Sequence, residues 1–179
     1  TNVKVADNAS ISGSKLGTGA ILQVKYFQLT TSQTEAYSTA NTDKAITNFV
    51  VNITPKSSSS IMKIESNVMY ETANSTWDTI WFFMRDSTKL GNTDSSSGVR
   101  NVGISIGTIS HPNNDSATTP ENASLTYFDA PSTTSAINYK LAVRTTATNN
   151  IFINRTIQDS NDVGCERGVS FISVTEIGG

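Results

Sequence analysis

The side chains that most often carry catalysis or bind metals are scarce in this sequence. It holds one histidine, His111, and one cysteine, Cys165, far apart and without carboxylates at ligand spacing. A Ser-His-Asp triad would have to use His111, and no nucleophile-elbow motif is present. We therefore expect no catalytic residue, no metal site and no cofactor, and a protein that is not an enzyme.

Acidic and aromatic residues suggest three further kinds of site. Residues 159–164 place acidic and amide oxygens before a glycine, but they lack the spacing of an EF-hand, so we prefer a plain turn to a calcium loop. Trp77 and Trp81 could form a platform for a sugar, although core or interface packing is the preferred interpretation. Glycoside hydrolysis would need a pair of carboxylates, and no particular pair stands out.

The composition argues against two classes of partner. The formal net charge is -2 and the pI is near 5.3, which gives no electrostatic reason to bind nucleic acid or an anionic membrane. No apolar run approaches the roughly 18 residues that a membrane span needs, so we expect no membrane insertion. A single cysteine cannot close a disulfide within the chain, so packing or assembly must stabilise the fold.

Residues 137–144 carry the clearest structural signal. Apolar residues alternate there with polar or small ones, which is the period of two that buries one face of a β-strand. Pro131 marks a stop before this strand. Turn-forming residues follow at 147–150 and the apolar pattern resumes at 151–157, so we predict that the two strands form a hairpin.

The same alternation recurs along the chain without a convincing helical period. A second hairpin is predicted for 46–54 and 61–73, on either side of Pro55 and a serine-rich turn. We predict an all-β fold, an antiparallel β-sandwich of jelly-roll type, with an extended N-terminal arm or linker at 1–19 and the head domain at 20–179. The expected strands cover residues 20–30, 46–54, 61–73, 79–85, 99–109, 123–128, 137–144, 151–157 and 168–177.

Two features predict a contact between copies of the chain. The strand expected at 79–85 is apolar on both faces, which requires a partner layer on each side, and it carries Trp81 and Phe83. A later strand carries the small residues Gly103 and Ser105, which indicate the close approach of another backbone. We predict that these four residues line the interface of a homotrimer.

Exposed loops on a rigid sandwich are the usual place for a binding site. Loops are expected at residues 31–44, 86–98 and 110–122. The candidate ligand-binding residues are Tyr37, Asn92 and His111 in these loops, and Trp77 just before the strand expected at 79–85.

Several segments match a known family in their order and spacing. They are ASISGSKLGTGAILQV (9–24), ITPKSSSSIMKI (53–64), FFMRDSTKLGN (82–92), DAPSTTSAINYKLAVRTT (129–146), IFINR (151–155) and VTEIGG (174–179). In these segments the chain resembles small virion proteins of tailed bacteriophages, in particular marine and cyanobacterial ones, which are described as tail-fibre-like or structural proteins.

The resemblance implies a distal fibre module, on the tail or the capsid, that assembles as a homotrimer and contacts the host surface, with a surface glycan as the expected receptor. In such proteins the segment that matches residues 10–20 joins a virion-attachment part to a β-rich head. The N-terminal arm is therefore expected to contact other virion proteins. The start at Thr1 without methionine fits a trimmed product or a segment of a longer protein. The resemblance supplies no catalytic residues.

Two other functions compete with the fibre module. A monomeric carbohydrate-binding module of a secreted enzyme would present aromatic side chains on one flat face, whereas most aromatic residues here fall at inward or interface positions. A glycan depolymerase would need a carboxylate pair in a cleft.

Overall fold

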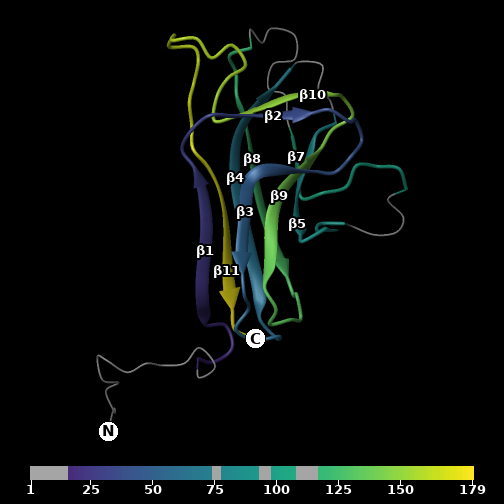
Figure 1. Cartoon of the computed structure of the whole chain (residues 1–179), viewed down its shortest axis with the longest axis vertical. Coiled ribbons are helices and arrows are strands. Elements are labelled where there is room, and N and C mark those ends of the chain that lie inside the picture. Colours follow the sequence, from purple (N-terminus) through teal and green to yellow (C-terminus); the bar gives the residue numbers. More distant parts are fainter. Residues whose placement is uncertain (1–15, 74–77, 93–97, 108–116) are drawn as a thin grey trace.

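The computed structural model describes residues 16–73, 78–92, 98–107 and 117–179, and the regular elements among them are β-strands (Figure 1). None of these residues belongs to a helix long and apolar enough to cross a membrane. The strands are β1 (Ile21–Leu29), β2 (Gln33–Tyr37), β3 (Lys44–Ile53), β4 (Ile61–Thr72), β5 (Ile80–Arg85), β6 (Thr88–Lys89), β7 (Ser105–Ile106), β8 (Glu121–Asp129), β9 (Ile137–Arg144), β10 (Asn149–Ile153) and β11 (Ser170–Ile177).

The strands form two antiparallel sheets that pack face to face. Sheet A has the order β1-β11-β4-β10-β2, and β8 also pairs with β4; sheet B has the order β3-β9-β5-β6, and β7 also pairs with β5. Apolar side chains of both sheets are buried together in one core. The all-β antiparallel sandwich that the sequence predicts is therefore confirmed. Its jelly-roll type, and the boundary between arm and head at residues 19 and 20, stay predictions.

Alternation along the strands decides which side chains enter the core. On β4, Met62, Ile64 and Val68 are fully buried, while the residues between them on the other face are partly exposed. On β9, Tyr139 and Leu141 are fully buried in the same way. Successive side chains of a strand point to opposite faces, so each set faces the opposite sheet. The inward faces predicted for these two strands are confirmed.

Neither of the two predicted hairpins forms. β3 pairs with β9 in sheet B, whereas β4 pairs with β8, β10 and β11 in sheet A. In the same way β9 pairs with β3 and β5, whereas β10 pairs with β2 and β4. The chain therefore crosses from one layer to the other at both places. A strand needs its apolar face against the core, and a crossing to the facing sheet meets this need as well as a hairpin does.

Glu176 on β11 holds the crossing between β3 and β4. This residue is fully buried, and its Oε1 accepts hydrogen bonds from the backbone N of Lys56 at 2.6 Å and from Oγ of Ser60 at 2.7 Å. Its Oε2 accepts a hydrogen bond from Nε2 of Gln23 on β1. Burial alone would raise the pKa of this carboxyl, but the hydrogen bonds outweigh burial and hold the pKa below its ordinary value of 4.5.

We expect Glu176→Gln to lower the free energy of unfolding at neutral pH by about 2 kcal/mol, because charge-assisted hydrogen bonds are lost. The lowered pKa also sets a pH dependence. The carboxylate stabilises the fold fully above 4.5, its ordinary pKa, and this contribution is lost as the pH falls through the folded-state value. Melting temperatures measured from about pH 3 to about pH 7 should therefore fall less steeply on acidification for the variant than for the wild type. Equal acid dependence of the two proteins would contradict this role.

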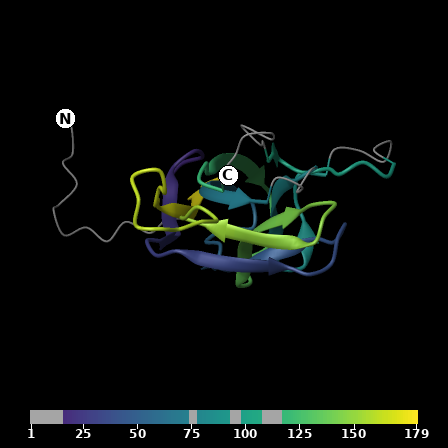
Figure 2. The same ribbon diagram turned by 90° about the horizontal axis from the view of Figure 1, so that it is seen from above.

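β2 and β10 lie side by side across the end of the long strands (Figures 1 and 2). Tyr37 on β2 is only 2% exposed, and its hydroxyl accepts hydrogen bonds from the backbone N of Thr42 at 3.1 Å and of Thr145 at 3.2 Å. The sequence predicts a loop at 31–44, and β2 within it was missed. Its two buried residues are Glu35 and Tyr37, so the segment lacks the apolar alternation that marks the other strands.

Asn154 joins four strands where β10 ends. It is buried and has a left-handed backbone, with φ of 59°. Its Nδ2 donates to the backbone O of Leu29 at 2.8 Å and of Thr31 at 3.1 Å, and its Oδ1 accepts a hydrogen bond from Oγ of Ser170. Its backbone N donates to the O of Met69 at 2.9 Å. One side chain thus connects the end of β1, the start of β11 and the end of β10, beside β4.

Both faces of β5 are buried within the chain itself. Trp81 and Phe83 lie between the sheets and have no exposed surface. On the other face, Phe82 is covered by Lys89 of β6, whose Nζ lies 3.9 Å from the ring centroid. Burial lowers the pKa of Lys89, and its ion pair with Asp43 at 3.2 Å opposes this shift only in part. The second layer that the sequence requires for this strand is therefore the connection that follows it.

Candidate functional site

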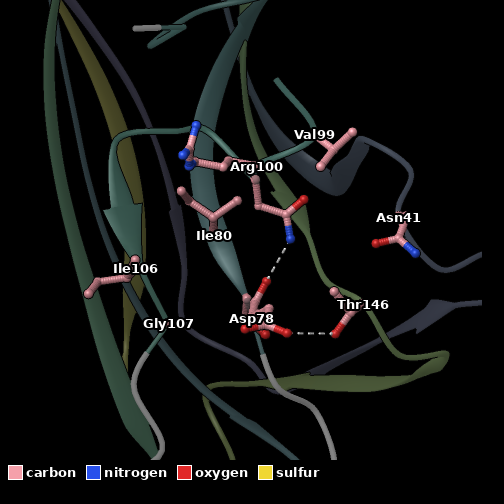
Figure 3. A pocket seen from close by; sticks show the side chains of 10 residues that line it. Asn41, Asp78, Ile80, Val99, Arg100, Ile106, Gly107 and Thr146 are labelled. Carbon is pink, nitrogen blue, oxygen red and sulfur yellow. Dashed lines mark hydrogen bonds between the residues drawn. The ribbon is translucent and has the colours of Figure 1, made fainter. Parts of the chain in front are cut away.

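A pocket opens beside the start of β5 (Figure 3). Its volume is about 570 Å³, and it is open to solvent along one side. The walls come from segments distant in sequence: residues 78–80, residues 99–101, residues 106–107, Asn41 before β3, and Thr146 after β9. The pocket thus depends on the sandwich to bring these segments together.

Asp78 supplies a carboxylate at one end of the pocket. Its backbone is left-handed, with φ of 54°, a conformation that Asp tolerates better than most residues. Its Oδ2 accepts a hydrogen bond from Oγ1 of Thr146 at 3.3 Å, and its backbone O accepts one from Nδ2 of Asn101 at 3.2 Å (Figure 3). These contacts fix the direction of the carboxylate while leaving Asp78 exposed to solvent.

The rest of the lining combines polar side chains, among them Arg100 and Asn41, with apolar ones. Ile80 is largely buried beneath it, whereas Ile106 and Val99 are strongly exposed at its rim. The pocket therefore combines carboxylate, amide and hydroxyl groups with an apolar patch. This combination suits a small polyhydroxylated ligand, whose hydroxyl groups can bind polar side chains while its C-H faces pack on apolar ones.

The segment at 103–107 packs closely against β5. A Cβ at Gly103 would lie 2.7 Å from Cγ1 of Ile80 and 2.9 Å from the backbone O of Trp81. The N of Ile104 donates to that same oxygen at 2.8 Å. The sequence predicts a close backbone approach at Gly103 and Ser105, and this approach is present, but the approaching backbone is the chain's own β5. Only Ser105 and Ile106 of the strand expected at 99–109 form a strand among the described residues.

The structure changes the interpretation of most of the predicted site residues. Trp77 and His111 lie outside the described residues. Asn92 is exposed in one of the predicted loops and is not among the described residues that line the pocket. Tyr37 is buried, and its hydroxyl bonds the backbone at Thr42 and Thr145, which gives it a structural role. It also helps to line a second pocket, of about 310 Å³, so its part in ligand binding stays a prediction.

The predicted copy interface also requires correction. Trp81 and Phe83 have no surface left for a partner, since both are fully buried in the core of the single chain. Gly103 and Ser105 are partly exposed, but their small size is explained by the contact with β5. The apolar second face of β5 is explained by Lys89. The features that suggested a homotrimer are thus satisfied within one chain.

Sequence reasoning located the neighbourhood of the pocket better than its residues. Asn41 belongs to the first predicted loop, and Val99 directly follows the second. Asp78 and Thr146 were missed. Asp78 had one signal, since it is an acidic residue that directly precedes a strand with two apolar faces, and Thr146 had none beyond its place after a strand.

The segment at 159–164 is a turn stabilised by its own side chains. Asp159 forms ion pairs with Arg155 at 3.4 Å and with Arg167 at 2.6 Å, and Oδ1 of Asp162 accepts a hydrogen bond from the N of Gly164 at 2.9 Å. These contacts favour the turn over a calcium loop. Within the described part of the chain, no three His, Cys, Asp or Glu side chains gather so as to hold a metal ion.

A second candidate surface is the outer face of sheet A, formed by the outward side chains of β1, β11, β4 and β8. Three aromatic residues are exposed on it: Tyr26 at 72%, Phe128 at 57% and Phe171 at 36%. The sequence predicted that most aromatic residues point inward. The aromatic residues in the core do so, but these three lie on one exposed face. This face is therefore a candidate binding surface besides the pocket at the start of β5.

Comparison with known proteins assigns the chain to no family. No family model matches the chain, and no curated protein matches it. Among solved structures, the chain is similar to one titled "Structure of infectious bursal disease virus Gx strain", with 11% sequence identity and a TM-score of 0.34. The match covers 88% of this chain and 41% of the length of that chain. A likeness of this degree carries no argument about function.

Proposed function

We propose that this chain is a non-enzymatic structural module of a bacteriophage virion, of fibre type, and that the pocket at the start of β5 contacts a glycan on the host surface. One observation supports the ligand part most directly. The pocket brings the Asp78 carboxylate, the Asn101 amide and the Thr146 hydroxyl beside the apolar side chains of Ile80 and Ile106. The resemblance of the ordered segments to virion fibre proteins supports the virion part.

The remaining parts of this proposal rest on the resemblance alone. They are a position on the tail or capsid fibre, attachment to other virion proteins through the N-terminal arm, and assembly as a homotrimer. Among the described residues, the chain enters β1 from Leu16 at one end of the sandwich. The pocket lies beside the start of β5. Arg85, at the other end of this strand, marks the opposite end of sheet B. A mass of three chains by light scattering would support the homotrimer.

A panel of immobilised bacterial surface polysaccharides would first identify a glycan that the wild type binds. Asp78→Ala is expected to reduce binding to this glycan by about tenfold. Loss of a hydrogen-bonding carboxylate in the binding site costs about 1.5 kcal/mol, which corresponds to that factor. Asp162→Ala is the matched control, because Asp162 is an exposed acidic residue in the turn at 159–164. If both variants bind like the wild type, the pocket is not the glycan site.

A monomeric carbohydrate-binding module is the second candidate, and one observation favours it. Tyr26, Phe128 and Phe171 are exposed on one sheet face, where aromatic rings can stack on the C-H faces of sugars. This candidate requires that the face stays free in solution. A mass of one chain, together with loss of polysaccharide binding in Tyr26→Ala but not in Asp78→Ala, would favour it over the fibre module.

A further inference from the structure

The outer face of sheet A is a regular grid of side chains. Cross-strand pairing aligns outward-facing residues in rows that run from β1 across β11 and β4 to β8. The rows are, from the end nearest the C-terminus, Ile21, Ile177 and Ile61; then Val24, Thr175, Lys63 and Phe128; then Tyr26, Ser173, Glu65 and Thr126; then Gln28, Phe171, Asn67 and Ser124.

Exposed apolar side chains lie on the β1 margin, at one end of the β8 margin and in the row nearest the C-terminus. On β1, Val24 is 52% exposed and Tyr26 is 72% exposed; on β8, Phe128 is 57% exposed, whereas the other two outward residues of β8 are polar. In the row nearest the C-terminus Ile21 is 62% exposed, and the other two isoleucines are partly exposed. Between the margins, Lys63 and Glu65 form an ion pair at 2.8 Å. The face therefore presents aromatic and aliphatic surface around a centre with no net charge.

We propose that the outer face of sheet A binds the same face of a second copy of this chain, through a two-fold axis that runs along the strands between β11 and β4. This contact does not rest on the virion role, and it is an alternative to the homotrimer proposed with that role. The arrangement of the grid supports it, because rotation about this axis exchanges β1 with β8 and β11 with β4 while keeping each row in register. An interface of this kind uses one surface patch on both copies.

The rotation brings apolar side chains of the two copies together in two of the four rows. Val24 of one copy meets Phe128 of the other, since both lie in the same row at opposite margins. Near the axis, Ile177 meets Ile61, so apolar surface is buried on both sides. These contacts bury Val24 and Phe128, which the single chain leaves exposed, whereas Tyr26 lies over Thr126 and Phe171 lies over Asn67.

The charged centre is also matched by the rotation. Lys63 of one copy lies over Thr175 of the other, and Glu65 lies over Ser173, so each charged group meets a hydroxyl and keeps its own ion-pair partner. No like charges face each other. A partner of strong net charge would gain nothing from this neutral centre, whereas a second copy is complementary to it.

The size of the face indicates a moderate affinity. Four strands and about eight residues cover roughly 500 Å², compared with about 800 Å² on each partner in a standard interface. We therefore expect a dissociation constant in the micromolar range. The aromatic rings supply most of the buried area, because each carries about 150–250 Å² of surface.

The first test is the mass of the wild-type chain by light scattering at concentrations up to roughly 100 µM, together with a matched pair of variants. Val24→Glu should raise the dissociation constant at least about tenfold, because two carboxylates would be buried without partners in each dimer. Val163→Glu is the control, since Val163 is fully exposed in the loop before β11 and lies outside the face. It should leave the mass unchanged.

The second test reports the orientation of the copies. In a Cys165→Ser background, the double variant Val24→Cys, Phe128→Cys should give a covalent dimer with a bismaleimide that spans about 10 Å, which is the spacing of stacked sheets. Within one chain these positions are three strands apart, roughly 14 Å, and a cross-link there would not change the mass on a denaturing gel. Each single cysteine variant should give little dimer.

The outcomes separate this proposal from the virion function. A monomer at every concentration, or a dimer that Val24→Glu leaves intact, would overturn it. A mass of three chains without the cross-link would also overturn it, while supporting the fibre module. A cross-linked dimer that shows no glycan binding would support the contact between copies and would contradict only the pocket proposal.

Discussion

Asp129→Ala is expected to lower the free energy of unfolding by about 3–5 kcal/mol, because it removes one partner of a largely buried ion pair. Asp129 ends β8 in sheet A, and its carboxylate accepts hydrogen bonds from Nη1 of Arg85 on β5 at 2.9 and 2.8 Å. It also accepts one from the hydroxyl of Tyr139 on β9 at 2.6 Å. The carboxylate thus ties sheet A to two strands of sheet B. Urea unfolding with an unchanged m value would measure the loss.

The matched control replaces both partners of this pair. Arg85→Met combined with Asp129→Leu should cost less than Asp129→Ala alone, because no charge is left without its partner inside the sandwich. Arg85→Met alone completes the double-mutant cycle. A loss below about 1 kcal/mol for Asp129→Ala would show that water compensates the guanidinium, and would contradict this role.

The same cluster determines how the sandwich responds to alkali. Burial, and then the hydrogen bond to Asp129, raise the pKa of Tyr139 well above its ordinary value of 10.0. The hydroxyl therefore stays a donor throughout the neutral range. Its contribution to stability is fully present below pH 10.0 and is lost at higher pH, where the unfolded chain ionises first.

Asn154→Ala is expected to lower the free energy of unfolding by about 3 kcal/mol. The substitution removes three hydrogen bonds to Leu29, Thr31 and Ser170 at a site that is only 1% exposed. It also forces alanine into the left-handed region, which costs about 1 kcal/mol by itself. Thermal or urea unfolding of the purified chain would report the total.

Two controls separate the side-chain and backbone parts of this effect. Asn154→Gly keeps the left-handed backbone at little cost, so it should lose only the hydrogen bonds. Asn48→Ala has the reverse design, because Asn48 is exposed and has φ of 67°, so it should cost about 1 kcal/mol. Equal losses for Asn154→Ala and Asn48→Ala would mean that the hydrogen bonds of Asn154 contribute nothing.

Local patterns predicted the strands well because they depend on neighbours in the chain. The alternation at 61–70 and 137–144 gave both the strand type and the inward faces, since a strand repeats every two residues. Pairing partners were not predictable in the same way. Apolar alternation shows that β3 and β4 each need a core, but it holds no information on whether they share a sheet or face each other.

The candidate site shows the same limit. β5 has two apolar faces, and sequence alone gave no means to tell that Trp81 and Phe83 face the core while the chain's own Lys89 covers the other face at Phe82. Tyr37 lay in a polar stretch and looked exposed, yet tertiary contacts with Thr42 and Thr145 bury it. Asp78 becomes a site residue only because Asn101 and Thr146 arrive beside it from distant segments.

The crossings between sheets have a consequence for how the chain reaches its structure. Among the described strands, only β5 and β6 pair with a direct neighbour in sequence, and β1 pairs with the last strand, β11. Folding must therefore close long loops before most pairs can form, so we expect it to be slow, with relaxation in milliseconds to seconds or longer. On the ribosome, sheet A stays incomplete until β11 has left the exit tunnel. Until then β1 and β4 expose strand edges that other nascent chains can pair with.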